Sequence, residues 1–321
     1  MNKLKKIGLS ALAGSLVATS AFAGEMSVGG SAKATWTDRE AGSITGNGIG
    51  MNKLLSFNGS GELDTGHTIS VYFGNNGTSQ SSASMTYDMG DMGSIMLDNG
   101  AGGHGIGSID DKTPTANEEI WDNISYGTGH DGFRVGIGNA GALAYTGTFA
   151  GVTASIDYLK QGGGSLEDGA TGAAGSGTGK SIALTMAPAD GLSMGFGFGD
   201  VGNADASNDS SQTTGFVTFA MGPVTLGAQM AEEAQSRANN WTTTQWGASF
   251  NLNDNISVGY GQRTIDVGND TSSKDEKDTG ISASWTAGSM SIKANINKAD
   301  DMKGTAGSDK ETTELAVSFA F

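Results

Sequence analysis

The sequence predicts an all-β protein, a membrane-spanning barrel of sixteen antiparallel strands. Apolar and polar residues alternate with period two along most of the chain, which is the pattern of strands with one apolar and one polar face. The alternating segments are about 7 to 12 residues long, close to the length of a strand that crosses a bilayer. Short turns and long polar loops alternate between these segments, as they do in outer-membrane barrels.

The alternation is clearest in the C-terminal half. Residues 290–297 place Met, Ile, Ala and Ile on one face, and Ser, Lys, Asn and Asn on the other. The same regularity recurs in 192–199, 246–252 and 315–321. Each strand is therefore expected to have one apolar face and one face of Ser, Thr, Asn, Gly or charged residues.

Sixteen segments meet these criteria. They are residues 26–37, 51–61, 67–76, 81–89, 92–98, 142–148, 152–160, 180–188, 191–200, 212–221, 223–230, 241–252, 255–266, 278–286, 289–298 and 310–321.

The first 23 residues predict a secretory signal peptide. Lys3, Lys5 and Lys6 precede a short apolar run, and Ala21-Phe22-Ala23 forms an A-x-A cleavage site. Residues 24–321 are then the mature barrel, in which 15 basic residues face 34 acidic ones, a net charge of -19. No later segment is long enough for a helical span, so an insertion into a membrane would have to use strands.

Composition excludes several functions. The chain has no Cys and 3 His, which removes thiolate chemistry and leaves little material for a metal centre. An acidic protein lacks the basic surface that nucleic acids require. No ordered catalytic triad is present, so we expect no enzyme activity and no cofactor. The acidic loops 205–209 and 274–278 carry carboxylates that could bind Ca²⁺ adventitiously.

One connection, residues 99–141, is much longer than the others. It carries the acids Asp110, Asp111, Glu118, Glu119 and Asp122 together with several apolar side chains. Acidic and apolar side chains in one segment favour a loop that packs against another part of the protein, such as the inner wall of a water-filled barrel. A long solvated external loop with a small hairpin at 124–137 is an equally weighted alternative.

Three blocks and the C-terminus resemble a known family. EMSVGGSAK at 25–33, SFNGSGELDTG at 56–66, LAYTGTFAGV at 143–152 and the strand ending in Phe321 are similar to the general diffusion porins of Gram-negative outer membranes, most closely the alphaproteobacterial kind. The resemblance implies a homotrimer in the outer membrane that passes small hydrophilic solutes and ions. It also implies that residues 99–141 fold into the pore as a constricting loop, and that Phe321 is an assembly signal.

In that family, acids on this loop face basic residues of the barrel wall. The resemblance places Lys33 at such a wall position, whereas Leu54 stands where a second basic residue is expected and Lys53 is one place off. The alternation independently puts Lys293 and Arg263 on polar strand faces. A ring of acids in a narrow pore filters ions by charge. The hypothesis is therefore a water-filled pore that leans toward cations.

A second class of protein fits the same alternation. A secreted soluble β protein, such as an adhesin or a surface-layer subunit, would pack the apolar faces of two sheets into a core and would have no transport role. Phe321 separates the two interpretations, because a barrel should need it for assembly and a soluble sandwich should not.

Overall fold

The computed structural model describes residues 24–39, 48–77, 80–122, 124, 140–160, 176–203, 209–235, 240–267 and 273–321. The expected signal peptide, residues 1–23, lies outside the described residues. So do most of the expected hairpin at 124–137 and most of the loop at 205–209.

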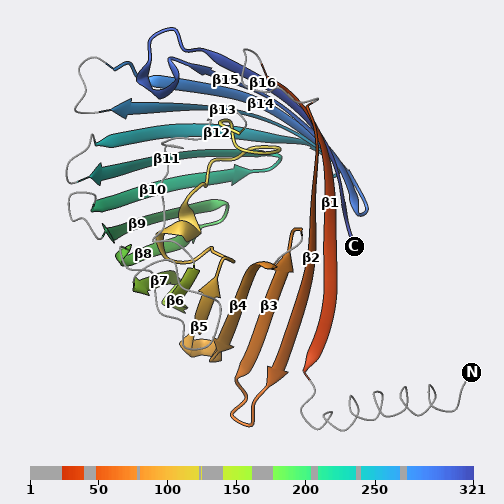
Figure 1. Ribbon diagram of the computed structural model, residues 1–321, viewed down its shortest axis with the longest axis vertical. Coiled ribbons are helices and arrows are strands. Elements are labelled where there is room, and N and C mark those ends of the chain that lie inside the picture. Colours follow the sequence, from red (N-terminus) through yellow and green to blue (C-terminus); the bar gives the residue numbers. More distant parts are fainter. Residues whose placement is uncertain are drawn as a thin grey trace, which may run out of the picture.

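The described residues form a closed barrel of sixteen strands in which each strand pairs with its neighbours in the sequence and β1 pairs with β16 (Figure 1). Every pairing in the barrel is antiparallel, which confirms the predicted fold class. Among the described residues, no helix is long and apolar enough to cross a membrane. The strands are β1 (Glu25–Arg39), β2 (Ile49–Glu62), β3 (Thr68–Asn75), β4 (Gln80–Asp88), β5 (Ser94–Asn99), β6 (Ala140–Phe149), β7 (Val152–Lys160), β8 (Ser176–Ala189), β9 (Leu192–Asn203), β10 (Ser210–Met221), β11 (Val224–Gln235), β12 (Trp241–Asn253), β13 (Ile256–Val267), β14 (Glu276–Ala287), β15 (Met290–Asp300) and β16 (Lys310–Ala320).

Each predicted segment coincides with one strand, but several strands run further at the loop end than the sequence pattern indicated. β11 continues to Gln235, past the predicted end at 230, and Glu233 still pairs with Gln212 of β10. The outward side chain at Glu232 is charged and exposed. Outward residues need to be apolar only within the lipid band, so the alternation fades before the hydrogen-bonded ladder ends.

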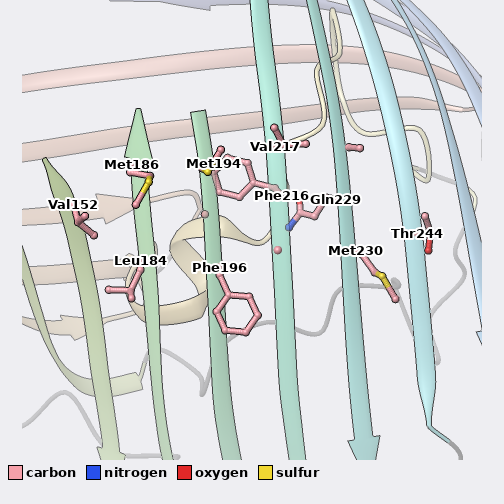
Figure 2. A pocket seen from close by; sticks show the side chains of 13 residues that line it. Val152, Leu184, Met186, Met194, Phe196, Phe216, Val217, Gln229, Met230 and Thr244 are labelled. Carbon is pink, nitrogen blue, oxygen red and sulfur yellow. The ribbon is translucent and has the colours of Figure 1, made fainter. Parts of the chain in front are cut away.

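The two faces of the barrel differ in polarity. Outward side chains such as Phe196 (54% exposed) and Met230 (54% exposed) are large and apolar, whereas the inward Gln229 is 2% exposed. An apolar groove of about 760 Å³ runs over the outer face of β8 to β12, with Leu184, Phe196 and Met230 among its lining side chains (Figure 2). Such an exterior suits lipid, and the polar interior suits water.

Short turns join the strands at one end of the barrel, the end that also holds both termini of the strand array. Ala150 and Gly151 have φ angles of 51° and 81°, the pair of positive values that a two-residue type I′ hairpin turn requires. Phe321 closes the ring, because its backbone exchanges two hydrogen bonds with Gly30, of 2.8 and 2.9 Å.

The long connection after β5 turns back into the barrel. Its described part, shown in yellow in Figure 1, includes the short 3₁₀ helix η2 (Gly105–Ile109) and crosses the interior past the inward faces of β7 to β15. We refer to residues 101–122 as the lumen loop. Its contacts with the wall define the candidate functional site.

Candidate functional site: the lumen loop and the wall around it

A row of four glycines lets the lumen loop approach the wall closely. The row crosses four strands in direct register and consists of Gly227, Gly247, Gly261 and Gly280. A Cβ atom on Gly227 would lie 2.5 Å from Cδ of Pro114, and one on Gly280 would lie 2.7 Å from Cγ2 of Ile120. These distances are too short for any real side chain, so the loop packs directly on bare backbone.

Two inward glutamine side chains hold the middle of the lumen loop. Gln229 of β11 accepts a hydrogen bond of 2.8 Å from the backbone N–H of Lys112 and donates one of 2.7 Å to the carbonyl of Ile109. Gln245 of β12 donates to the carboxylate of Asp111 at 3.1 Å. Both glutamines are almost fully buried, so these bonds satisfy polar groups that water does not reach.

Two asparagines of β15 hold the far end in the same way. Asn297 donates to the carbonyls of Glu119 and Asp122, at 3.2 and 3.0 Å. Asn295 accepts a bond of 3.0 Å from the side chain of Asn117. Both lie on the inward face of β15, which the alternation of 290–297 predicts as polar.

The start of the lumen loop is fixed by His104. Its Nδ1 lies 2.8 Å from Asp157 of β7 and its Nε2 lies 3.0 Å from Asp98 of β5, and all three side chains are buried. An imidazole with carboxylates on both nitrogens donates from both, which is the protonated form. The hydrogen bond to Asp157 contributes most to raising the pKa of His104 above its ordinary value, and Asp98 adds to the effect.

The loop backbone next to His104 is bonded to the wall as well. The N–H of Gly105 donates to Ser155 and that of Ile106 donates to Ser181, each at 2.8 Å. Ser181 in turn donates to Asp157, the partner of His104, at 2.5 Å. The His104 contacts and these two backbone bonds therefore form one connected network.

Arg263, which the alternation placed on the pore wall, does lie on an inward face, but its side chain is 0% exposed. Its guanidinium pairs with Asp278 at 2.5 Å and with Glu276 at 3.5 Å, both on the neighbouring β14. It also lies 4.5 Å from the ring centroid of Trp121 in the lumen loop. Arg263 thus anchors the loop through a cation–π contact, and its charge is balanced locally by two carboxylates.

Lys33 is brought together with one of the predicted loop acids. Its ammonium lies 3.0 Å from Glu118, and both side chains are about one third exposed. Lys293 lies on the inward face of β15, two residues nearer the short turn than Asn295. It lines the wall on the turn side of the loop.

The other loop acids differ in environment. Asp110 is exposed, whereas Asp111 accepts bonds from Thr113 and from Gln245. Burial, and after it the nearby carboxylates with Glu314 first among them, together raise the pKa of Asp122 to about 6. Burial is also the main cause of the raised pKa of Glu119. The acids are thus close enough to repel one another.

The wall formed by β2 to β5 carries no lysine or arginine on its inward face within the described strands. Leu54 points inward there, and Lys53 lies on the opposite face beside the exposed Met51 and Leu55. The inward positions are instead neutral or acidic. They are Gly50, Asn52, Leu54, Ser56, Asn58, Ser60, Glu62, Thr68, Ser70, Tyr72, Gly74, Ser82, Ser84, Thr86, Asp88, Ser94, Met96 and Asp98.

Two further expectations concern the C-terminus and metals. The ring of Phe321 is 78% exposed and lies close to Gly30 of β1, and its role in assembly stays a prediction. Across the described part of the chain, no group of three or more His, Asp or Glu side chains could hold a metal ion.

The roles predicted for the loop acids and Lys33 stay predictions, and the glycine row and the His104 network were not predicted. The glycines were read as part of ordinary polar strand faces. Isolated glycines inside strands at 227, 247, 261 and 280 were the available signal, because such glycines often mark a close approach of another backbone. His104 had no signal in the sequence, since its two carboxylate partners lie 6 and 53 residues away.

The chain matches the family model of the Gram-negative porins over residues 8–321. No curated protein sequence matches the chain. The match covers nearly the whole length, including all sixteen strands.

Solved porin structures share the fold. A porin refined at 1.8 Å has 16% sequence identity and a TM-score of 0.66, covering 92% of this chain and 100% of its own. An anion-selective porin from Comamonas acidovorans has 13% identity and a TM-score of 0.65, covering 93% and 100%. Salmonella typhi OmpF, solved with daunomycin, has 13% identity and a TM-score of 0.66, covering 93% and 98%. At these identities the likeness concerns the fold alone.

Substituting Gly280→Ala should displace the lumen loop. The new Cβ would lie 2.7 Å from Ile120, and overpacking of this kind costs about 1–3 kcal/mol. We expect a lower free energy of unfolding in urea and an altered single-channel conductance. The control is Gly215→Ala on the outer face, where the nearest atom is 3.6 Å from the added Cβ. Equal behaviour of the two variants would contradict a role for the glycine row.

The attachment of the loop at His104 should weaken as pH rises. The pKa of His104 in the folded chain is raised above 6.5, so the contribution of the imidazolium is complete below about pH 6.5 and is lost as pH rises through the folded value. Hydrogen exchange of the Gly105 and Ile106 amides, corrected for intrinsic rates, should show protection falling over that interval. His104→Gln should show low protection without a pH step, and a profile identical to that of the wild type would refute the assignment.

Proposed function

The chain belongs to the Gram-negative porin family, and we propose that this outer-membrane channel is constricted by the lumen loop and prefers cations over anions. Family membership sets aside the alternative of a secreted soluble β protein. The solutes are small, hydrophilic molecules and ions that diffuse passively through a water-filled lumen.

The distribution of charge across the lumen supports the preference for cations. The lumen loop brings five carboxylates to the interior, those of Asp110, Asp111, Glu118, Glu119 and Asp122. Lys33 balances one of them, and the buried Arg263 is already balanced by its own strand neighbours. The described inward faces of β2 to β5 add no basic residue. A narrow passage with net negative charge attracts cations and repels anions.

We further propose that the channel is a homotrimer embedded in outer-membrane lipid and works without a cofactor. The apolar outer face supports the contact with lipid. Family membership supports the trimer. Any Ca²⁺ at the acidic loops 205–209 and 274–278 would be adventitious, so a chelator should leave the conductance unchanged.

Reversal potentials across a planar bilayer under a KCl gradient test the preference. The wild-type channel should be cation-selective, with conductance appearing in steps of three if trimers insert. Removing one charge with Glu118→Gln should lower the cation-to-anion permeability ratio about two- to threefold, because a unit charge about 7 Å away in water is worth about RT. Asp254→Asn, on a short turn, is the matched control and should change nothing. Clear anion selectivity of the wild type would overturn the proposal.

The preference for cations should decline in acid. Asp122 has a pKa raised to about 6, so it is charged at pH 7 and gains a proton as the pH falls through that value. We expect the permeability ratio to fall between about pH 7 and pH 5. In Asp122→Asn the ratio at pH 7 should already be lower and the remaining decline should shift to lower pH. A ratio that is flat across this range in the wild type would show that Asp122 does not act on passing ions.

A further inference from the structure

A separate hollow lies on the turn side of the lumen loop. It measures about 470 Å³ and sits between the loop and the inward faces of β6 to β10. It is distinct from the acidic passage, since no Asp or Glu is among the described residues that line it.

Hydroxyl groups cover most of this hollow in a regular array. Thr153 of β7 stands opposite Thr185 of β8, and Ser193 of β9 stands opposite Thr218 of β10. Thr146 of β6 stands opposite Ser155 of β7 in the same way. Paired inward positions across five strands therefore present hydroxyls at the spacing of neighbouring strands, about 5 Å.

Several of these hydroxyls are available to a ligand. Thr185, Ser193 and Thr218 form no side-chain hydrogen bond with any other residue that the structure describes, and the three are only half-buried. The other hydroxyls of the hollow are partly engaged, since Thr153 bonds to Thr148 at 2.8 Å and Ser155 accepts a bond of 2.8 Å from the N–H of Gly105. The donors and acceptors that stay open to a solute therefore include those of Thr185, Ser193 and Thr218.

The remaining lining groups suit a sugar. Among the residues placed by the structure, Lys112 is the charged side chain that lines the hollow, and its ammonium can donate to a hydroxyl or ring oxygen. Ile109, Ala183 and Phe216 form a buried apolar cluster at the edge, against which the C–H face of a sugar ring can pack. An anionic solute is disfavoured, because it would first have to pass the carboxylates of the lumen loop.

We propose that this hollow is a binding site for a neutral polyhydroxylated solute of mono- or disaccharide size. The site holds the solute through the open hydroxyls of β8 to β10 while it passes through the channel. This rests on the proposed function, because the solute reaches the hollow through the lumen.

The test is reversible block of ion current in a planar bilayer by maltose and by glucose. Wild-type current should fall with sugar concentration and saturate. The double variant Thr185→Val and Thr218→Val, which removes two hydroxyls at nearly constant volume, should weaken the apparent affinity about tenfold. The matched control is Thr68→Val with Thr86→Val, which removes two inward hydroxyls from the opposite wall. It should leave the block unchanged.

Two results would overturn the site while leaving the channel intact. They are a wild-type current that falls only in proportion to bulk conductivity, without saturation, and an equal loss of affinity in both double variants. If the strand variants fail to assemble, Lys112→Met in the lumen loop replaces them and should weaken the block severalfold, and an unchanged block would then refute the site. A complete absence of conductance would instead overturn the proposed function, and this site with it.

Discussion

The interior of this barrel depends on one constraint: the lumen loop packs closely against a band of the wall that is formed by glycines. Gly227, Gly247, Gly261 and Gly280 remove every Cβ from a band across β11 to β14, and the loop fills the space with Pro114 and Ile120. Because the loop backbone then lies within reach of the wall, buried amides such as Gln229 and Asn297 can satisfy its carbonyls and N–H groups. Packing and hydrogen bonding thus reinforce each other along the same line of contact.

The charges of the interior follow from this placement. Buried cations at both ends of the loop are balanced by strand carboxylates, Arg263 by Asp278 and His104 by Asp98 and Asp157. Those pairs fix the loop and leave little net charge. The loop acids remain, and Glu118 among them pairs with Lys33. The loop that narrows the lumen therefore also makes the electrostatic potential of the lumen negative. Among the described residues, the hydroxyl-lined hollow on the turn side of the loop carries the ammonium group of Lys112.

The sequence predicted the strands well because alternation is a local consequence of a wall between lipid and water. It ended some strands too early, because the hydrogen-bonded strands continue past the lipid band, as β11 does to Gln235. For the candidate site it predicted a group of loop acids and, through the family resemblance, Lys33 on the wall, which lies 3.0 Å from Glu118. It placed Arg263 on a polar strand face, and in the structure Trp121 and two carboxylates surround this buried side chain. It could not find the His104 network, whose members are distant in sequence.

The sequence by itself determined sixteen alternating strands, each with one apolar and one polar face, and an acidic loop too long for a simple turn. Period-two patterning suffices for this but fits a soluble sandwich as well, and the closed barrel decided that the apolar faces point outward. Only the tertiary structure decided which loop acid pairs with Lys33, that Leu54 and not Lys53 faces the lumen, and that four glycines meet in one row. These outcomes depend on register between strands and on a loop crossing the interior, and neither is encoded in the pattern of a single strand.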